Sequence, residues 1–586
     1  MMMSSKSFLI LMMAGLLLGM ASLPAIAQEN PVPTLIPPTL APTADAAGIS
    51  DALLAESTTA RIQREGKVRV GLLYNLPPFG ELNIRGQVAG FDADLARSLV
   101  ETWGLTFEPV QVTRQMALDA LRNGDVDMVV AAQVHRRELD GMVEFSQTYY
   151  PTAQAMAVRA DDGAVSLAAM VGRRIGVVLG YPGEQAVAVW RQRAGLMVTV
   201  IPYLTLDRAV TALLTGEVDG VVENRVQLTR VILDLSLVRL LDEPVSPEPY
   251  AVVVPRQDVN FRNLVNRTLQ YLKKTGRLNE IHQTYFEGAN YPENALPLWA
   301  NVGDEAPTPA LFGGDVPYPP QYVVPRLQSA RVVRVAGAAE LQPDAPESEK
   351  RLDALNRALV EAMAARWGVS VEFIPNSAGN AADLVAAGQA DLAVGVPLDW
   401  ALADRVDLTG FYLLHGERLM VEQNAPYETF NSLRGRWVGI FASEPGAADR
   451  VNALAQTVNS SVRIFTILRE QDAAFNMLVE ENADVVFGDS LKLIPHLEAN
   501  PGLLRITTRG EAPDPWYSRT YRALAVPRND LDFRLLVDYT LQELAYDGVW
   551  RGLMSPVMLP EDIPALEIWP GPSSYLGFNL DEALAG

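Results

Sequence analysis

The chain has 586 residues, of which 49% are hydrophobic and 20% charged, so it is long enough for several soluble globular domains. Its formal net charge of -22 disfavours binding to nucleic acid or to an anionic membrane surface. Cysteine is absent, which excludes disulfides, thiolate metal sites, a cysteine nucleophile and a lipid-modified cysteine.

The first segment has the pattern of a secretory signal peptide. Lys6 precedes an apolar run over residues 8–20, and an A-x-A cleavage site ends at Ala27. We therefore assign residues 1–27 to a signal peptide; an uncleaved membrane anchor is the alternative. Residues 28–58 are rich in proline and predict an extended, semi-rigid linker.

Residues 59–288 alternate between predicted strands and predicted helices. The strands are expected over 67–73, 107–112, 126–132, 174–179, 197–202, 218–222 and 250–254, and the helices over 91–103, 116–122, 184–194, 206–214 and 264–287. Asp92 is the expected cap of the first helix and Gly104 its stop. This alternation predicts an α/β module with mainly parallel sheets covered by helices on both faces.

The α/β pattern starts again after residue 157, so this module is expected to have two lobes. Lobe A comprises 59–157 and 250–288, and lobe B comprises 158–249. Two crossing segments between the lobes predict a hinge with a cleft, and ligands prefer such inter-lobe clefts.

Short segments of this module recur later in the chain at a spacing of 263 to 272 residues. The recurring pairs are 99–104 and 363–368, 124–127 and 388–391, 172–176 and 435–439, 254–256 and 526–528, and 268–270 and 540–542. The spacing is that of a whole module rather than of a solenoid repeat. It predicts a second, divergent module over 330–555, a proline-rich linker over 289–329, and a tail over 556–586 that packs against the second module.

Five motifs of the first module occur in the order found in one protein family. They are Leu76-Pro77-Pro78-Phe79, Gly90-Phe91-Asp92-Ala93-Asp94-Leu95-Ala96, Gly124-Asp125-Val126-Asp127, Phe145-Ser146-Gln147-Thr148-Tyr149-Tyr150 and Gly216-Glu217-Val218-Asp219. With them the module resembles the extracellular solute-binding proteins, family 3, of polar amino acid ABC transporters. The resemblance implies tandem modules of the type 2 periplasmic binding fold, whose two lobes close on a small polar solute.

The resemblance also implies an arginine that holds the solute carboxylate in a Thr-x-x-Arg motif before Phe145. The register position of that arginine is Leu139. The preceding segment contains Gln133, Arg136 and Arg137, and either arginine can serve from a shifted loop. The alternative for this segment is a solvated basic turn.

Two further positions of the family are altered in this chain. A helix N-terminus normally helps to hold the carboxylate, but here Tyr181 and a proline replace the usual Ser or Thr. The carboxylate for the solute ammonium falls on Asn224, with Glu223 just before it. The same count in the second module gives Asp489, for which a helix cap is the alternative.

The cleft walls follow from the same resemblance. The family's aromatic wall position is occupied by a leucine, and Tyr74 and Phe79 lie nearby as substitutes. Packing within the turn is the alternative for Phe79. Arg114 stands at the position of a second wall residue and is a candidate cation of the cleft.

The sequence offers no catalytic motif. The four histidines are scattered without metal-ligand spacing, and no P-loop, Gly-x-Gly-x-x-Gly or Gly-x-Ser-x-Gly occurs. We therefore expect a protein that is not an enzyme and has no cofactor or bound metal. An enzyme on this scaffold would need an acid/base pair in the cleft.

The resemblance implies an exported protein, periplasmic or extracellular and either soluble or membrane-tethered. It is expected to capture a small polar solute, such as an amino acid, and to deliver it to an ABC permease in the membrane. An extracellular sensor or interaction module on the same fold is the alternative. We expect a monomer and no nucleic-acid partner.

Overall fold

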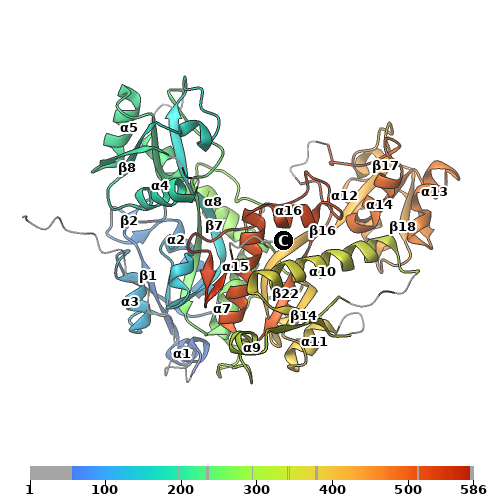
Figure 1. The fold of residues 1–586 in the computed structure, drawn as a ribbon, viewed down its shortest axis with the longest axis horizontal. Coiled ribbons are helices and arrows are strands. Elements are labelled where there is room, and N and C mark those ends of the chain that lie inside the picture. Colours follow the sequence, from blue (N-terminus) through green and yellow to red (C-terminus); the bar gives the residue numbers. More distant parts are fainter. Residues whose placement is uncertain are drawn as a thin grey trace, which may run out of the picture. The chain divides into compact units, whose positions relative to one another are not determined.

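A computed structural model describes residues 56–580, except for 194, 196, 233–235, 294, 339–340, 342–343, 376–379 and 511–513. The predicted signal peptide and most of the predicted linker over 28–58 lie outside these residues. Within the described part, no helix combines the length and the apolar composition that a membrane crossing requires. The described residues form an α/β protein with several mixed sheets flanked by helices (Figure 1).

The first half of the described chain, residues 56–288, is built on a nine-stranded sheet. Its main path runs through β5 (Thr106–Gln111), β1 (Lys67–Leu72), β6 (Met128–Val129), β12 (Ser246–Pro255), β7 (Val143–Arg159), β10 (Gly220–Asn224), β8 (Arg174–Val178) and β9 (Thr199–Tyr203), and β11 (Val238–Leu240) pairs with β7. β7 pairs with β12 and then with β10 and β11, so it runs through the whole sheet.

Helices cover this sheet, and a small three-stranded sheet lies beside it. The helices are α1 (Thr58–Glu65), α2 (Phe91–Thr102), α3 (Ala117–Arg122), α4 (Pro182–Arg193), α5 (Leu206–Thr215), α6 (Arg225–Val231), α7 (Val259–Lys274) and α8 (Arg277–Tyr285). The small sheet contains β2 (Asn75–Leu76), β3 (Gly80–Leu82) and β4 (Val88–Ala89).

The second half, residues 330–555, contains two five-stranded sheets. One has the order β14 (Ser370–Phe373), β13 (Val332–Ala336), β15 (Leu392–Pro397), β22 (Thr520–Pro527), β16 (Val406–His415), and the other has the order β19 (Arg463–Ile467), β18 (Trp437–Phe441), β20 (Val485–Asp489), β17 (Glu417–Glu422), β21 (Leu504–Ile506). When strands are matched by their order along the chain, these two sheets have the same arrangement as β5-β1-β6-β12-β7 and β9-β8-β10-β7-β11 in the first half. β16 and β17, separated only by Gly416, stand in the place of β7.

The remaining elements are the helices of the second half and several short pieces. The helices are α9 (Val323–Ala330), α10 (Glu347–Trp367), α11 (Ala381–Ala386), α12 (Ala447–Thr457), α13 (Ala473–Leu478), α14 (Ser490–Ala499), α15 (Leu531–Tyr546) and α16 (Val549–Met554). The 3₁₀ turns are η1 (Arg137–Leu139), η2 (Leu167–Met170), η3 (Pro309–Leu311), η4 (Trp400–Leu402), η5 (Phe430–Ser432) and η6 (Glu470–Asp472), and β23 (Ser574–Tyr575) pairs with β24 (Phe578–Asn579).

Two predictions about helix ends are wrong. Gly90 is the N-cap of α2, whereas Asp92 lies in the first turn and is buried. Its carboxylate accepts hydrogen bonds from the Ala132 amide (2.6 Å) and the Tyr149 hydroxyl (2.9 Å) instead of capping the helix. The single helix predicted over 264–287 is the pair α7 and α8, separated at Gly276, whose φ of 83° suits glycine.

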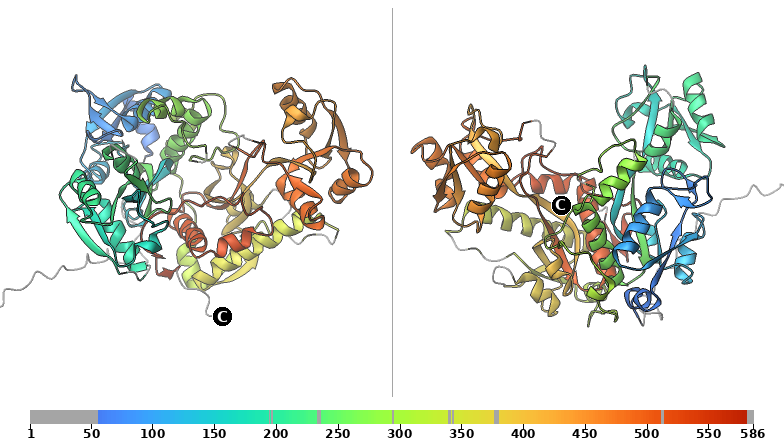
Figure 2. Two further views of the ribbon diagram at one scale, coloured as in Figure 1. Left: turned by 90° about the horizontal axis from the view of Figure 1, so that it is seen from above. Right: turned by 180° about the vertical axis from the view of Figure 1, so that it is seen from behind.

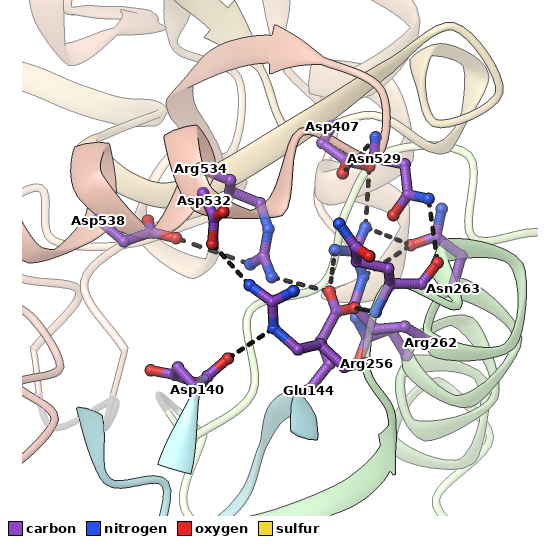
Figure 3. A network of polar contacts seen from close by, with 12 residues as sticks. Asp140, Glu144, Arg256, Arg262, Asn263, Asp407, Asn529, Asp532, Arg534 and Asp538 are labelled. Carbon is purple, nitrogen blue, oxygen red and sulfur yellow. Dashed lines mark hydrogen bonds and ion pairs between the residues drawn. The ribbon is translucent and has the colours of Figure 1, made fainter. Parts of the chain in front are cut away.

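A buried polar network joins the two halves (Figure 3). Glu144 on β7 accepts hydrogen bonds from Arg262 on α7 (2.6 Å) and from Arg534 on α15 (2.9 Å). Arg262 also donates to Asp407 on β16 (2.9 Å). The N-terminal ends of α7 and α15, green and orange-red in Figures 1 and 2, therefore meet through shared carboxylates.

The segment after each half packs on that half and also contacts the other half; the tail joins the core of the second half, as predicted. Trp299 lies against Trp400, with ring centroids 4.6 Å apart, and both donate to Gln270 Oε1. In the C-terminal tail, Trp569 stacks on His135 of the first half, with centroids 3.8 Å apart. These aromatic contacts place parts of both segments, which we call the extensions, in the interface between the two halves.

Candidate functional site

Four buried polar side chains gather where β7, β10 and β12 meet. Gln154 on β7, Glu223 and Asn224 at the end of β10, and Glu248 on β12 are each at most 5% exposed. The sheet register places Asn224 opposite Gln154. The side-chain amide of Asn224 donates to Glu248 Oε2 (2.7 Å) and to the Tyr250 hydroxyl (3.0 Å). We call these four residues the first polar cluster.

The first polar cluster contains two acidic groups in an environment that favours their neutral forms. Burial raises the pKa of Glu248, and a hydrogen bond from Asn224 and the charges of Arg114 and Arg136 oppose the rise. Burial also raises the pKa of Glu223, and the negative charge of Glu248 adds to the rise. A cationic group bound here would favour ionisation of both carboxyls.

The start of α4 borders this cluster. A Cβ on Gly183 would lie 2.6 Å from the carbonyl oxygen of Val222 and 3.0 Å from Gln154 Oε1, so only glycine fits this approach. Tyr181, predicted to take part in binding, is 53% exposed in the same loop. Gln227 on α6 donates to the carbonyl oxygen of Pro77 (3.1 Å) and links α6 to the turn after β2.

The two predicted aromatic wall residues differ in exposure. Tyr74 is half-buried, and burial raises the pKa of its hydroxyl. Phe79 is 1% exposed and packs edge-on against Tyr150 and Tyr250, with ring centroids 5.1 and 5.2 Å away. Its ring therefore supports Tyr250, which in turn binds Asn224 of the cluster.

The basic segment before Phe145 is divided between two surroundings. Gln133 is half-buried and its amide lies 3.4 Å from the carbonyl oxygen of Val134. Arg136 acts electrostatically on Glu248, as described above. Arg137 is buried against the second half, where it pairs with Glu543 and donates to Gln542 Oε1 (2.9 Å). Arg136 pairs with Glu138 (3.3 Å) and acts on Glu248 only through its charge, whereas Arg137 belongs to the contact with the second half.

Asp489, the predicted residue of the second half, lines a cavity of about 440 Å³. It is also the N-cap of α14, because its carboxylate accepts the Leu491 amide. The His415 ring lies 2.6 Å from its other carboxylate oxygen. The alternative of a helix cap is therefore confirmed, and binding of a ligand by Asp489 stays a prediction.

Sequence reasoning missed Gln154 and Glu248. The available signal was local: Gln154 directly precedes the apolar run 155–158, and Glu248 stands between two prolines just before the apolar run 250–254. Among the described residues, no group of three or more His, Asp or Glu side chains could hold a metal ion. The first polar cluster contains two carboxyl groups and two side-chain amides.

Comparison with known proteins gives a family match for part of the chain. Residues 68–288 match the bacterial extracellular solute-binding proteins, family 3. The ABC transporter glutamine-binding protein GlnH of Bacillus subtilis is 25% identical over 237 residues, which are 40% of this chain and 85% of that protein. The L-arginine-binding protein of Pseudomonas aeruginosa is 26% identical over 239 residues, which are 39% of this chain and 90% of that protein.

Solved structures include similar chains. One is an ancestral arginine-binding protein bound to arginine, which is 31% identical with a TM-score of 0.32, over 38% of this chain and 98% of that chain.

Proposed function

We propose that this chain binds an amino acid and serves an ABC transporter as a non-enzymatic binding protein. Its residues 68–288 match the bacterial extracellular solute-binding proteins, family 3. The family match carries this proposal. The named relatives bind glutamine or arginine, and both belong to the size class that an inter-lobe cleft can enclose.

We place the solute of the first half at the first polar cluster. Glu223 and Glu248 are buried without a cation at hydrogen-bond distance among the described residues, so a solute ammonium or guanidinium group would compensate them. Arg114 and Arg136 supply the positive charge that a solute carboxylate needs. This arrangement favours an amino acid with a cationic side chain.

The second half is proposed to be a divergent copy of the first. The repeated strand order supports this, and so does a repeated buried hydrogen bond. The Trp103 indole donates to Thr268 (2.8 Å), and the Trp367 indole donates to Thr540 (2.8 Å). A type 2 periplasmic binding fold in tandem, exported to the periplasm or the cell exterior, is the architecture that we propose.

Isothermal titration calorimetry with L-arginine, L-lysine, L-glutamine and L-glutamate tests the first site. We expect a basic amino acid to bind more tightly than glutamate. Glu248→Gln should weaken its binding at least about tenfold, because a hydrogen bond to a charged group is lost.

Glu217→Gln provides the control, because Glu217 is an exposed carboxylate of the same half. It should leave affinity unchanged. No binding of any common amino acid to the wild-type chain would refute the function, whereas unchanged binding by Glu248→Gln would refute only the placement of the site.

A further inference from the structure

The cavity of about 440 Å³ in the second half is formed by both of its sheets and lies outside the region that matches the family. Its walls come from the start of α10, the junction of β16 and β17, the loop between β18 and α12, the start of α14 and the start of β22. Its volume is within the range of small-molecule sites.

The cavity occupies the topological position of the first polar cluster. Asp489 pairs with Glu417 in the sheet register, as Asn224 pairs with Gln154 in the first half. His415 pairs with Thr520, as residue 152 pairs with Glu248. The side chains differ at each of these positions, so the two sites have different chemistry.

A positive charge lies at the β22 side of the cavity. Arg522 Nε donates to His415 Nε2 (3.0 Å), and Arg522 Nη1 donates to the carbonyl oxygen of Gly395 (2.6 Å). Since His415 Nε2 accepts this bond, its proton lies on Nδ1 and is donated to Asp489. Among the described residues, no carboxylate lies within ion-pair distance of Arg522.

An incompletely satisfied carboxylate lies at the loop between β18 and α12. Glu444 Oε1 accepts the Asp489 amide (3.1 Å) and lies 3.3 Å from Lys492 Nζ. The Glu444 side chain is only 10% exposed, and its Oε2 atom is buried without a hydrogen-bond partner among the described residues. Such a buried acceptor is costly unless a donor reaches it.

We propose that this cavity is a second ligand site, which binds a small zwitterion through its carboxylate to Arg522 and its ammonium group to Glu444 Oε2. A guanidinium fork suits a carboxylate, and an ammonium group supplies the donor that Glu444 Oε2 lacks. The ligand class is that of amino acids without a charged side chain, because Arg450 pairs with Glu417 and Lys492 with Glu444. Glu349, which also lines the cavity, is exposed to solvent, so its charge is screened.

The two sites should therefore select different solutes. The first polar cluster contains Glu223 and Glu248, whereas the second half has Gly488, in β20, at the position of Glu223 and Thr520 at the position of Glu248. The acids at these two positions are lost, and the acids gained at the positions of Asn224 and Gln154 are already paired, Asp489 with His415 and Glu417 with Arg450. Arg522 remains as a cation without a carboxylate partner among the described residues. A cationic side chain fits the first site and a neutral one fits the second.

Calorimetric titration of the full chain with each of the common L-amino acids tests this inference. We expect a neutral amino acid to bind in addition to the ligand of the first site. Glu444→Gln and Arg522→Gln should each weaken the neutral ligand at least about tenfold and leave the other ligand unchanged. Glu248→Gln should have the opposite pattern.

Asp449→Asn is the matched control, because Asp449 is an exposed carboxylate on α12 near the cavity. It should change neither affinity. The inference is overturned if Glu248→Gln abolishes all binding, or if folded Glu444→Gln leaves every affinity unchanged. Glu444→Gln preserves side-chain volume and decides the question by itself if Arg522→Gln does not fold. Loss of the neutral ligand alone would support this site even if the first site failed its own test.

Discussion

Asp92 lies in the motif Gly90–Ala96 that resembles the family, and in the structure its carboxylate holds neighbouring parts of the fold together. The carboxylate lies between α2 and the turn after β6, and it binds the Ala132 amide, whose residue has a φ of 45°. The Tyr149 hydroxyl fixes its other oxygen. Burial raises the pKa of Asp92 to about 7, and its hydrogen bonds only partly oppose this rise.

The raised pKa of Asp92 predicts a specific pH dependence of stability. The native state binds this proton more tightly than the unfolded state, so its stabilising effect is complete below about pH 4 and is lost as the pH rises toward 7. The loss is up to about 4 kcal/mol. In Asp92→Asn this dependence should disappear, leaving a constant offset.

Urea unfolding of Asp92→Asn and wild type at pH 5 and pH 8 measures this difference. The free energy of unfolding of the variant minus that of wild type should be larger at pH 8 than at pH 5. Asp119→Asn, at an exposed position on α3, should follow wild type at both pH values. Parallel pH profiles for Asp92→Asn and wild type would contradict the prediction.

At this scale the sequence identifies positions near a strand end better than it identifies their partners. Counting from Asp219 places Asn224 at a candidate site, and the structure has it as the last residue of β10. Glu248 reaches Asn224 only through the pairing of β12 with β7, which no local pattern reveals. Arg137 is likewise part of a basic turn in sequence, but its partner Glu543 is 406 residues away.

Among the secondary-structure elements, α10 differs most from its counterpart. α2 has 12 residues and α10 has 21, and the additional N-terminal turns border the cavity of the second half. Arg351 on these turns pairs with Glu498 on α14 (2.6 Å) and donates to the carbonyl oxygen of Pro556 (3.2 Å). α10 therefore connects the two sheets of the second half (Figure 1).

Removing this connection should loosen the start of α10. Arg351 and Glu498 are partly exposed, so Arg351→Ala should cost less than about 1 kcal/mol of global stability. Locally, however, hydrogen–deuterium exchange over residues 347–355 should accelerate up to about fivefold. Lys350→Ala, an exposed neighbour, should leave exchange unchanged. Equal exchange in both variants would show that the connection does not hold the helix.

Local patterns predict most elements of the first half and fail where tertiary structure decides. The expected helix over 206–214 corresponds to α5, whose apolar face and glycine stop are both local signals. β7 has 17 residues, longer than any strand expected from sequence, because both ends of the sheet use it. The break at Gly276 was missed because the apolar spacing continues through it.

At the scale of the whole molecule, the two halves make equivalent contacts with each other across their interface. Arg256, just before α7, donates to Asp532 in the first turn of α15 (2.6 Å), and Arg528, just before α15, donates to Asn260 in the first turn of α7 (2.7 Å). The extensions correspond too, because the Trp299 amide donates to Gln270 Oε1 and the Trp569 amide to Gln542 Oε1. The proline-rich composition of residues 289–329 predicts a linker but cannot reveal this packing, because the receiving surface comes from the other half.

This interface predicts that the two halves unfold together and that one buried arginine couples them. Arg262 is 5% exposed and joins Glu144 of the first half to Asp407 of the second. Arg262→Ala leaves Asp407 buried without its cation, a change that costs about 3–5 kcal/mol. Since each half retains its own core, calorimetry should show one transition for wild type and two for the variant. Arg277→Ala removes an exposed ion pair on α8 and a 3.3 Å hydrogen bond to Ser98, both within the first half. This control variant should unfold in one transition, with a free energy of unfolding within about 1 kcal/mol of wild type. If Arg262→Ala also unfolds in one transition at the wild-type temperature, the shared carboxylates do not couple the halves.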